Sequence, residues 1–189
     1  MCGIVGLMTR DGSAPDGFTV EEMAAAVRHR GPDGEGRYSA RNFAMAQTRL
    51  AIIDLETGDQ PLYEPGGAAL VANGEIYNHI ELRSDLVGSS FATASDCEVP
   101  LHLYRRHGLD FVDYLRGMYA IALYDPIEGQ LVLARDPFGI KPLYWGESGD
   151  TFFFASELKA LRAFPGWTPA IDQDSLAAYM RRNYVPGPR

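Results

Sequence analysis

Met1-Cys2-Gly3-Ile4-Val5-Gly6 opens the chain of 189 residues, and its second residue carries the strongest chemical signal in the sequence. Removal of Met1 would leave Cys2 with a thiol and a free α-amino group on the same residue. In model compounds the amine titrates near pH ~8 and the thiol near pH ~8.5, so the amine can accept the proton of the thiol. The stretch predicts an N-terminal nucleophile. Taken alone, the position also fits an incidental cysteine at a frayed terminus.

The composition is that of a globular domain. Of the 189 residues 46% are hydrophobic, which is enough for one sizeable core. No apolar run approaches the ~20 residues that span a bilayer, and no basic segment precedes an apolar one at the amino end. We therefore expect no membrane segment and no secretion, and we expect the protein to be cytoplasmic. A formal net charge of −8 argues against a nucleic-acid surface and is accounted for by solubility.

No metal site is expected. Cys2 and Cys97 are the only cysteines, which is too few for a disulfide framework or a four-thiolate zinc site. The histidines do not show the spacing of paired metal ligands: they are His29, His79, His102 and His107. Cys97 is a second candidate nucleophile at a predicted helix start, but no base lies beside it in sequence. We therefore interpret Cys97 as a small core residue.

The pattern of the chain predicts helices and many short strands. Capping boxes at Thr19–Glu22 and Ser95–Glu98 predict helices through Arg28 and through His107, and further helices are predicted over 78–87 and 175–182. Strands are predicted at 43–47, 68–72, 118–124, 130–135 and 151–155. Turn residues at 125–129 and 146–150 predict two hairpins, and Arg28–Gly36 is predicted to be an ordered loop. Antiparallel sheets covered by helix layers fit this pattern.

Three internal residues or pairs suit the recognition of a small polar substrate. Arg49 can hold a carboxylate through its planar fork, although a surface ion pair is the alternative. Asn73 and the N–H of Gly74 can form an oxyanion hole, with a simple Asn-Gly turn as the alternative. Asp96 can receive an ammonium group, but a carboxylate at a helix start is also explained by capping.

Together these residues stand in a series of motifs that covers most of the chain. The motifs are Met1-Cys-Gly-Ile-Val-Gly6, His29-Arg-Gly-Pro-Asp33, Arg49-Leu-Ala-Ile-Ile-Asp54, Asn73-Gly-Glu-Ile-Tyr-Asn78, Ser95-Asp-Cys-Glu-Val99, Arg116-Gly-Met-Tyr-Ala120, Arg135-Asp-Pro-Phe-Gly-Ile-Lys-Pro-Leu-Tyr144 and Ala155-Ser-Glu-Leu-Lys-Ala160. In this order they resemble the glutamine amidotransferase domain of glutamine-hydrolysing asparagine synthetases, which are class II amidotransferases of the N-terminal nucleophile hydrolase type. Other class II amidotransferases share the opening Cys2 and the Asn73-Gly74 pair.

The resemblance implies an α+β fold, a four-layer αββα sandwich. It implies that Cys2 is the nucleophile and its amine the base, with Asn73 and Gly74 as the oxyanion hole. Substrate contacts are implied for Arg49 at the α-carboxylate, for main-chain groups around Ile52 and Ile53, and for Glu75 and Asp96 at the α-ammonium. The implied reaction is hydrolysis of L-glutamine to glutamate and ammonia through a γ-glutamyl thioester.

The resemblance also sets expectations for domains and partners. Relatives continue into an ATP-dependent synthetase domain that nothing here resembles, so ATP and magnesium are expected only in that domain and no cofactor in this one. We expect 1–189 to be one glutaminase domain, with 165–189 a less certain C-terminal segment and the sandwich truncated at its C-terminal end. Expected partners are L-glutamine and the synthetase domain of a full-length chain. A homodimer is left open.

The acceptor of the ammonia is expected to be aspartate, and another acceptor stays open because it would bind outside this chain. Two further classes of function also stay open. One is a non-catalytic fragment that binds glutamine or a partner without turnover. The other is an N-terminal nucleophile hydrolase acting on a different amide, although the pairing of Arg49 with Asp96 argues against it.

Overall fold

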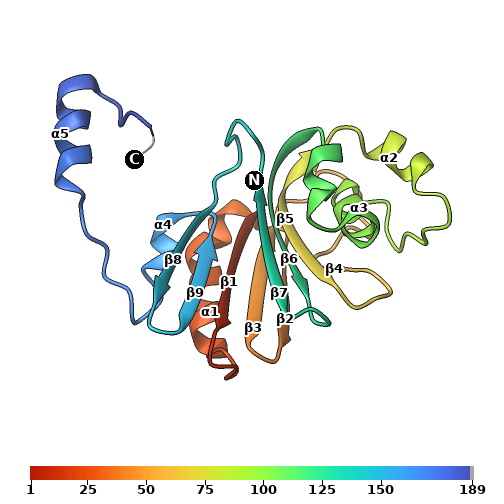
Figure 1. Ribbon diagram of the computed structural model, residues 1–189, viewed down its shortest axis with the longest axis horizontal. Helices are drawn as coiled ribbons and strands as arrows, with labels where there is room; N and C mark the ends of the chain where they lie inside the picture. Colours follow the sequence, from red (N-terminus) through yellow and green to blue (C-terminus); the bar gives the residue numbers. More distant parts are fainter. Residues whose placement is uncertain (188–189) are drawn as a thin grey trace.

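Two antiparallel β-sheets face each other between layers of helices in the computed structural model, which describes residues 1–187 (Figure 1). The first sheet has the strand order β2-β3-β1-β9-β8 and the second has the order β4-β5-β6-β7. The α+β sandwich expected from the sequence is thereby confirmed. No helix within residues 1–187 has the length and apolar character needed to cross a membrane.

The first sheet is made of β1 (Gly3–Thr9), β2 (Gly34–Ala40), β3 (Phe43–Arg49), β8 (Tyr144–Ser148) and β9 (Thr151–Ala155). The helices on its outer side are α1 (Gly17–Val27) and α4 (Leu158–Leu161). The second sheet is made of β4 (Leu62–Tyr63), β5 (Ala69–Ile76), β6 (Gly117–Asp125) and β7 (Gln130–Arg135). It is covered by α2 (His79–Asp85), α3 (Val99–His107) and the 3₁₀ helix η3 (Gly108–Tyr114). The remaining 3₁₀ helices are η1 (Arg28–Arg30) and η2 (Asp96–Glu98).

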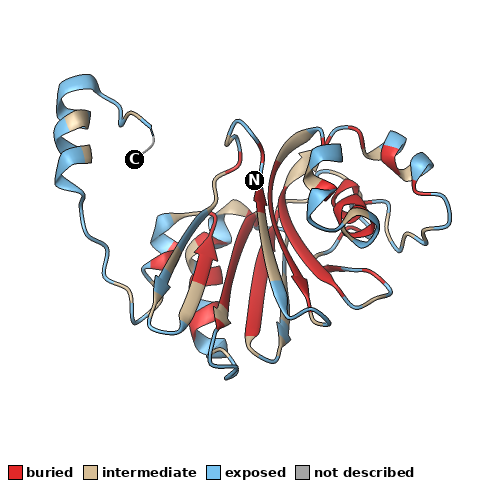
Figure 2. Cartoon of the chain, viewed as in Figure 1, coloured by how far each residue is buried: buried red, intermediate tan, exposed pale blue. Residues whose placement is uncertain are grey.

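Three separate hydrophobic cores account for the four layers. One lies between α1, α4 and the first sheet, a second lies between the two sheets, and a third lies between the second sheet and its helices. Successive side chains of a strand point to opposite faces, so Phe153 packs in the helix-side core and Phe154 packs between the sheets. This explains why β9 shows no polar alternation. Figure 2 shows the buried residues concentrated in the strands of the two sheets.

Several local predictions need correction. The first helix begins at Gly17 and is capped by Asp16, whose carboxylate accepts from the N–H groups of Phe18 and Thr19 at 3.2 Å, so the predicted cap at Thr19 is wrong. Asp16 caps the helix in place of Thr19 because it precedes the first helical turn and its carboxylate can reach two free N–H groups. The predicted loop over 28–36 is also wrong at both ends, since it contains η1 and the beginning of β2.

The strands predicted at 130–135 and 151–155 are confirmed to the residue, and the hairpin at 125–129 joins β6 to β7. β1, β2, β4 and β8 were not predicted as strands. Trp167 still packs on the helix-side core, and beyond it the chain leaves the sandwich and forms α5 (Gln173–Arg182), which has no buried residue and stands apart in Figures 1 and 2. That helix begins two residues before its predicted start because the side chain of Asp172 caps it.

Candidate active site

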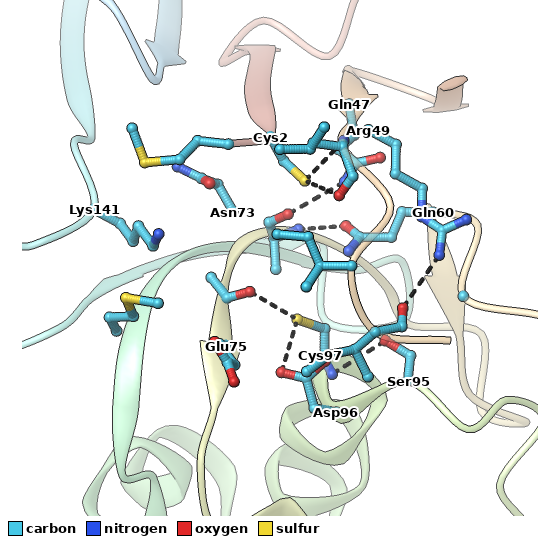
Figure 3. Close-up of a pocket in the computed structure, with 18 residues that line it drawn as sticks. Cys2, Gln47, Arg49, Gln60, Asn73, Glu75, Ser95, Asp96, Cys97 and Lys141 are labelled. Atoms are coloured by element: carbon cyan, nitrogen blue, oxygen red, sulfur yellow. Dashed lines mark hydrogen bonds between the residues drawn. The ribbon is translucent and has the colours of Figure 1, made fainter. Parts of the chain in front are cut away.

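One pocket, at the end of the two sheets where β1 begins, brings together all of the predicted site residues (Figure 3). They are Cys2, Arg49, Ile52, Ile53, Asn73, Gly74, Glu75 and Asp96. The pairing of β1 with β3 places Gly3 opposite Thr48, so the register brings Cys2 level with Arg49. Cys2 also shares the alternation of Ile4, and Asn73 that of Val71, two residues whose side chains lie between the sheets. The side chains of Cys2 and Asn73 therefore approach each other from opposite sheets.

Cys2 is half-buried, immediately before β1. The N–H of Leu50 donates to Cys2 Sγ at 3.4 Å, and the thiol lies 3.6 Å from the carbonyl oxygen of Leu50. The carbonyl oxygen of Cys2 accepts from Arg30 Nε at 2.9 Å. Met1 lines the same pocket and is 53% exposed. The thiol is thus accessible from the pocket while its backbone is held from behind.

Arg49 ends β3 and is 7% exposed. Its Nη1 donates to Asp59 Oδ1 at 2.7 Å, and its Nη2 donates to the carbonyl oxygens of Asp54 at 2.5 Å and Ile53 at 3.4 Å. Asp59 itself lies largely in water, with 82% of its side chain exposed. The guanidinium is therefore a buried cation beside the pocket. The ion pair that the sequence left open is also present, with the exposed Asp59 as the partner of Arg49.

Asn73 and Gly74 lie inside β5, where they pair with Ala120 and Tyr119 of β6. The continuous strand rules out the Asn-Gly turn. Asn73 is buried, and its Nδ2 has no hydrogen-bond partner in the described part of the chain. A buried amide donor without a partner costs free energy unless a ligand satisfies it. At Gly74 a Cβ atom would lie 2.5 Å from the carbonyl oxygen of Met118, so the close approach of the strands requires glycine.

Asp96 does not cap its helix. Ser95 is the cap and accepts from the N–H of Cys97 at 3.3 Å, whereas Asp96 Oδ2 accepts from the N–H of Ile76, at the end of β5, at 2.7 Å. Asp96 is 3% exposed. The carboxylate of a buried residue is thereby fixed at the wall of the pocket, next to the half-buried Glu75.

Cys97 lines the pocket from the opposite side to Cys2 and packs in the core of the second sheet, as expected for a small core residue. Burial raises the pKa of the Cys97 thiol well above its usual value, and the negative charge of Asp96 acts in the same direction. Its Sγ lies 3.7 Å from Asp96 Oδ2 and 4.0 Å from the carbonyl oxygen of Gly74. Cys97 is therefore a neutral thiol, which is a poor nucleophile.

Sequence reasoning assigned no role to several other lining residues. Gln47 Nε2 donates to the carbonyl oxygen of Ala72 at 3.3 Å, and Gln60 Oε1 accepts from the N–H of Ala72 at 2.6 Å. Lys141 is 7% exposed and adds a second cation to the pocket. Its only sequence signal is its place in the 135–144 motif. Within residues 1–187, no cluster of three or more His, Cys, Asp or Glu side chains is arranged to hold a metal ion.

The pocket thus combines a thiol, an amide donor, buried cations and carboxylates. Two cations, Arg49 and Lys141, and two carboxylates, Glu75 and Asp96, line it together. A small molecule with both an ammonium and a carboxylate group finds opposite charges for each. The unsatisfied amide of Asn73 offers a donor to a carbonyl oxygen.

Comparison with known proteins gives a consistent result. Residues 1–189 match the family of glutamine amidotransferase domains. Asparagine synthetase [glutamine-hydrolyzing] 3 of Arabidopsis thaliana is 43% identical over 98% of this chain and 33% of its own length. Asparagine synthetase [glutamine-hydrolyzing] 1 of Bacillus subtilis (strain 168) is 40% identical over 100% of this chain and 30% of its own. The chain therefore spans about a third of the length of these curated relatives.

Among solved structures, the glutamine phosphoribosylpyrophosphate amidotransferase of B. subtilis, complexed with ADP and GMP, is similar over 86% of this chain and 43% of its own. The TM-score is 0.73 and the sequence identity is 27%. A second structure, described as the allosteric regulatory enzyme of purine biosynthesis, gives a TM-score of 0.73 at 26% identity.

Proposed function

The chain belongs to the family of glutamine amidotransferase domains, and from this premise we propose that it hydrolyses L-glutamine to glutamate and ammonia with Cys2 as the nucleophile. The observation that carries the proposal is the single pocket in which Cys2, Arg49, Asn73 and Asp96 meet. A thiol, a cation, an unpaired amide donor and a carboxylate match the four groups of glutamine that must be attacked or held.

The proposed reaction begins when the α-amine of Cys2 accepts the thiol proton and the sulfur attacks the side-chain carbonyl carbon of glutamine. The carbonyl oxygen becomes an oxyanion, which Asn73 Nδ2 and the N–H of Gly74 stabilise. The protonated amine then gives its proton to the departing nitrogen, the C–N bond breaks, and ammonia leaves. Water attacks the resulting γ-glutamyl thioester, which releases glutamate and restores the thiol.

Substrate recognition is proposed to rest on charge. Arg49 binds the α-carboxylate, and main-chain groups around Ile52 and Ile53 line that end of the pocket. Asp96 and Glu75 face the α-ammonium. Because Arg49 and Asp96 are both more than nine-tenths buried, their charges act in a medium less polar than water and discriminate strongly between ligands.

We further propose that residues 1–189 supply ammonia to an ATP-dependent amidation, with aspartate as the acceptor. The names of the relatives that match this chain over nearly its full length support this step. Binding of ATP, magnesium and the acceptor would fall to the portion of such relatives that this chain does not match.

The test is a glutaminase assay on the purified protein, with glutamate and ammonia measured in parallel and the amino terminus read by mass spectrometry. We expect equal amounts of the two products and a terminus at Cys2. If Met1 stays attached, the amine is a peptide nitrogen without basicity, and Met1 also occupies part of the pocket wall. Full activity with Met1 intact would contradict the mechanism.

A further inference from the structure

Two sequence motifs that the proposed reaction does not use meet beside the nucleophile. The 29–33 motif contributes Arg30 and the 155–160 motif contributes Glu157, and neither of these two residues lines the pocket. The two are 127 residues apart in sequence, yet Arg30 Nη1 donates to Glu157 Oε1 at 2.8 Å. Their contact lies next to the start of β1, because Arg30 also reaches the backbone of Cys2.

Arg30 joins this pair to the nucleophile. Its Nε donates to the carbonyl oxygen of Cys2 at 2.9 Å, and only 9% of its side chain is exposed. Of the carboxylates in the described residues, Glu157 alone lies within ion-pair distance of Arg30. The second terminal nitrogen of Arg30 is buried without a hydrogen-bond partner. The orientation of this buried cation therefore depends on one carboxylate.

Glu157 is itself firmly placed. The preceding residue, Ser156, is fully buried; its Oγ accepts from the N–H of Ile4 at 3.0 Å and its own N–H donates to the Ile4 carbonyl oxygen at 2.9 Å. The carboxylate of Glu157 also contacts His29 Nε2 at 3.1 Å and Lys159 Nζ at 3.2 Å. Burial alone would raise the pKa of Glu157, but the hydrogen bonds from Arg30 and Lys159 lower it, so the group is ionised.

From these contacts we propose that Glu157 is a positioning residue for the reaction, acting through Arg30 on the backbone of Cys2. The inference rests on the proposed role of Cys2 as nucleophile. A buried guanidinium that loses its only carboxylate is strongly disfavoured and turns toward water. Arg30 then releases the Cys2 carbonyl, and the thiol and amine, which share that backbone, lose their fixed placement against the substrate.

The experiment compares Glu157→Gln with Glu147→Gln. Glu147 makes a more exposed pair with Arg10 at the other end of the first sheet, where β1 ends, so it controls for the removal of a carboxylate from an arginine pair away from Cys2. Steady-state glutamine hydrolysis gives kcat and KM for each variant. The rate of Cys2 alkylation by iodoacetamide, a small neutral reagent, reports on the thiol without glutamine.

We expect Glu157→Gln to lower kcat by about 10- to 100-fold, the range for a misplaced reacting group, with KM within about twofold of the parent. The alkylation rate should change in Glu157→Gln and not in Glu147→Gln. Glu157→Asp, which keeps the charge, should recover part of kcat. The double variant Arg30→Met/Glu157→Gln should be no slower than Arg30→Met, since both act through one contact.

The proposal is wrong if kcat of Glu157→Gln stays within about twofold of Glu147→Gln. It is equally wrong if KM rises while kcat holds, or if the two losses multiply in the double variant. Should Glu157→Gln fail to fold, Glu157→Asp is read by the same criteria. If the parent protein releases no ammonia from glutamine, the proposed function fails. If the parent protein releases ammonia but Glu157→Gln is as active as Glu147→Gln, the proposed function stands and the positioning role of Glu157 fails.

Discussion

The two sheets contribute to the pocket by different means. The first sheet supplies Cys2 and Arg49 at strand ends, and each is held by a side chain from elsewhere, Arg30 for Cys2 and Asp59 for Arg49. The second sheet supplies Asn73 and Gly74 from within β5, where the ladder to β6 fixes the backbone. Asp96, next to that sheet, is anchored by a main-chain N–H.

This difference shows how a fold can divide the tasks of one site. The groups at strand ends depend on contacts with charged side chains from elsewhere in the chain, which single substitutions can remove. Groups built into the middle of a strand depend on the sheet itself, so they change only when their own side chain changes. The following substitutions probe each side of the pocket, starting with the largest expected effect.

The sharpest contrast is between the two cysteines, one on each side of the pocket. Cys2→Ala should lower glutamine hydrolysis by at least about 1,000-fold because it removes the proposed nucleophile, while binding of glutamine, measured by calorimetry, persists. Cys97→Ala should keep most of the activity, since burial raises the pKa of Cys97 and keeps its thiol neutral. The reverse result would transfer the nucleophile to the second sheet.

Loss of a donor from the proposed oxyanion hole should give the next largest effect. Asn73→Ala removes the unpaired Nδ2 donor, so kcat should fall by about 100- to 1,000-fold while KM changes little, because the donor is needed mainly in the transition state. Initial rates over a range of glutamine concentrations separate the two constants. A change confined to KM would mean that Asn73 binds the ground state and stabilises no oxyanion.

Arg49→Ala should act on binding. Loss of the cation proposed to bind the α-carboxylate is expected to raise KM by roughly 30-fold with a smaller change in kcat, as for a contact already present in the ground state. Arg37→Ala is the matched control, because Arg37 lies on the neighbouring β2 and forms exposed ion pairs with Glu21 and Glu35. If the two variants have the same KM for glutamine, Arg49 does not bind the substrate.

The second sheet was easier to predict from sequence than the first. β6 and β7 are runs of Tyr, Ile, Leu and Val joined by a turn, which is the usual strand signal. β1 was missed because Gly3 and Gly6 weaken the strand pattern of its sequence. The need for glycine there comes from tertiary packing, since a Cβ atom at Gly6 would lie 2.5 Å from the ring of Phe154. β2 was missed because its glycines resemble a loop, and only pairing with β3 makes it a strand.

The eight predicted site residues come from the sequence motifs, and the fold brings all of them into one pocket. What sequence could not give are the residues that hold them. Asp59, Arg30 and Glu157 are charged side chains of common types, and their partners follow only from the way distant segments pack. The capping box predicted at Ser95–Glu98 already made Ser95 the cap, which the fold confirms, but whether the carboxylate of Asp96 also served the helix start was open until the fold showed its bond to the N–H of Ile76.

Asp96 therefore allows the last and smallest test, in which binding and folding can be separated. Asp96→Asn removes the negative charge proposed to face the substrate ammonium but keeps an oxygen that can accept from the N–H of Ile76. We expect glutamine affinity to fall by about tenfold, the order of one charge-assisted contact, with the melting temperature nearly unchanged. Ser95→Ala, which removes the true cap, should instead lower the melting temperature by about 2–4 °C, since a cap contributes ~1 kcal/mol. Thermal unfolding and calorimetric titration of both variants decide the matter. If Asp96→Asn melts earlier and binds glutamine as the parent does, the carboxylate serves the fold of the second sheet and not the substrate.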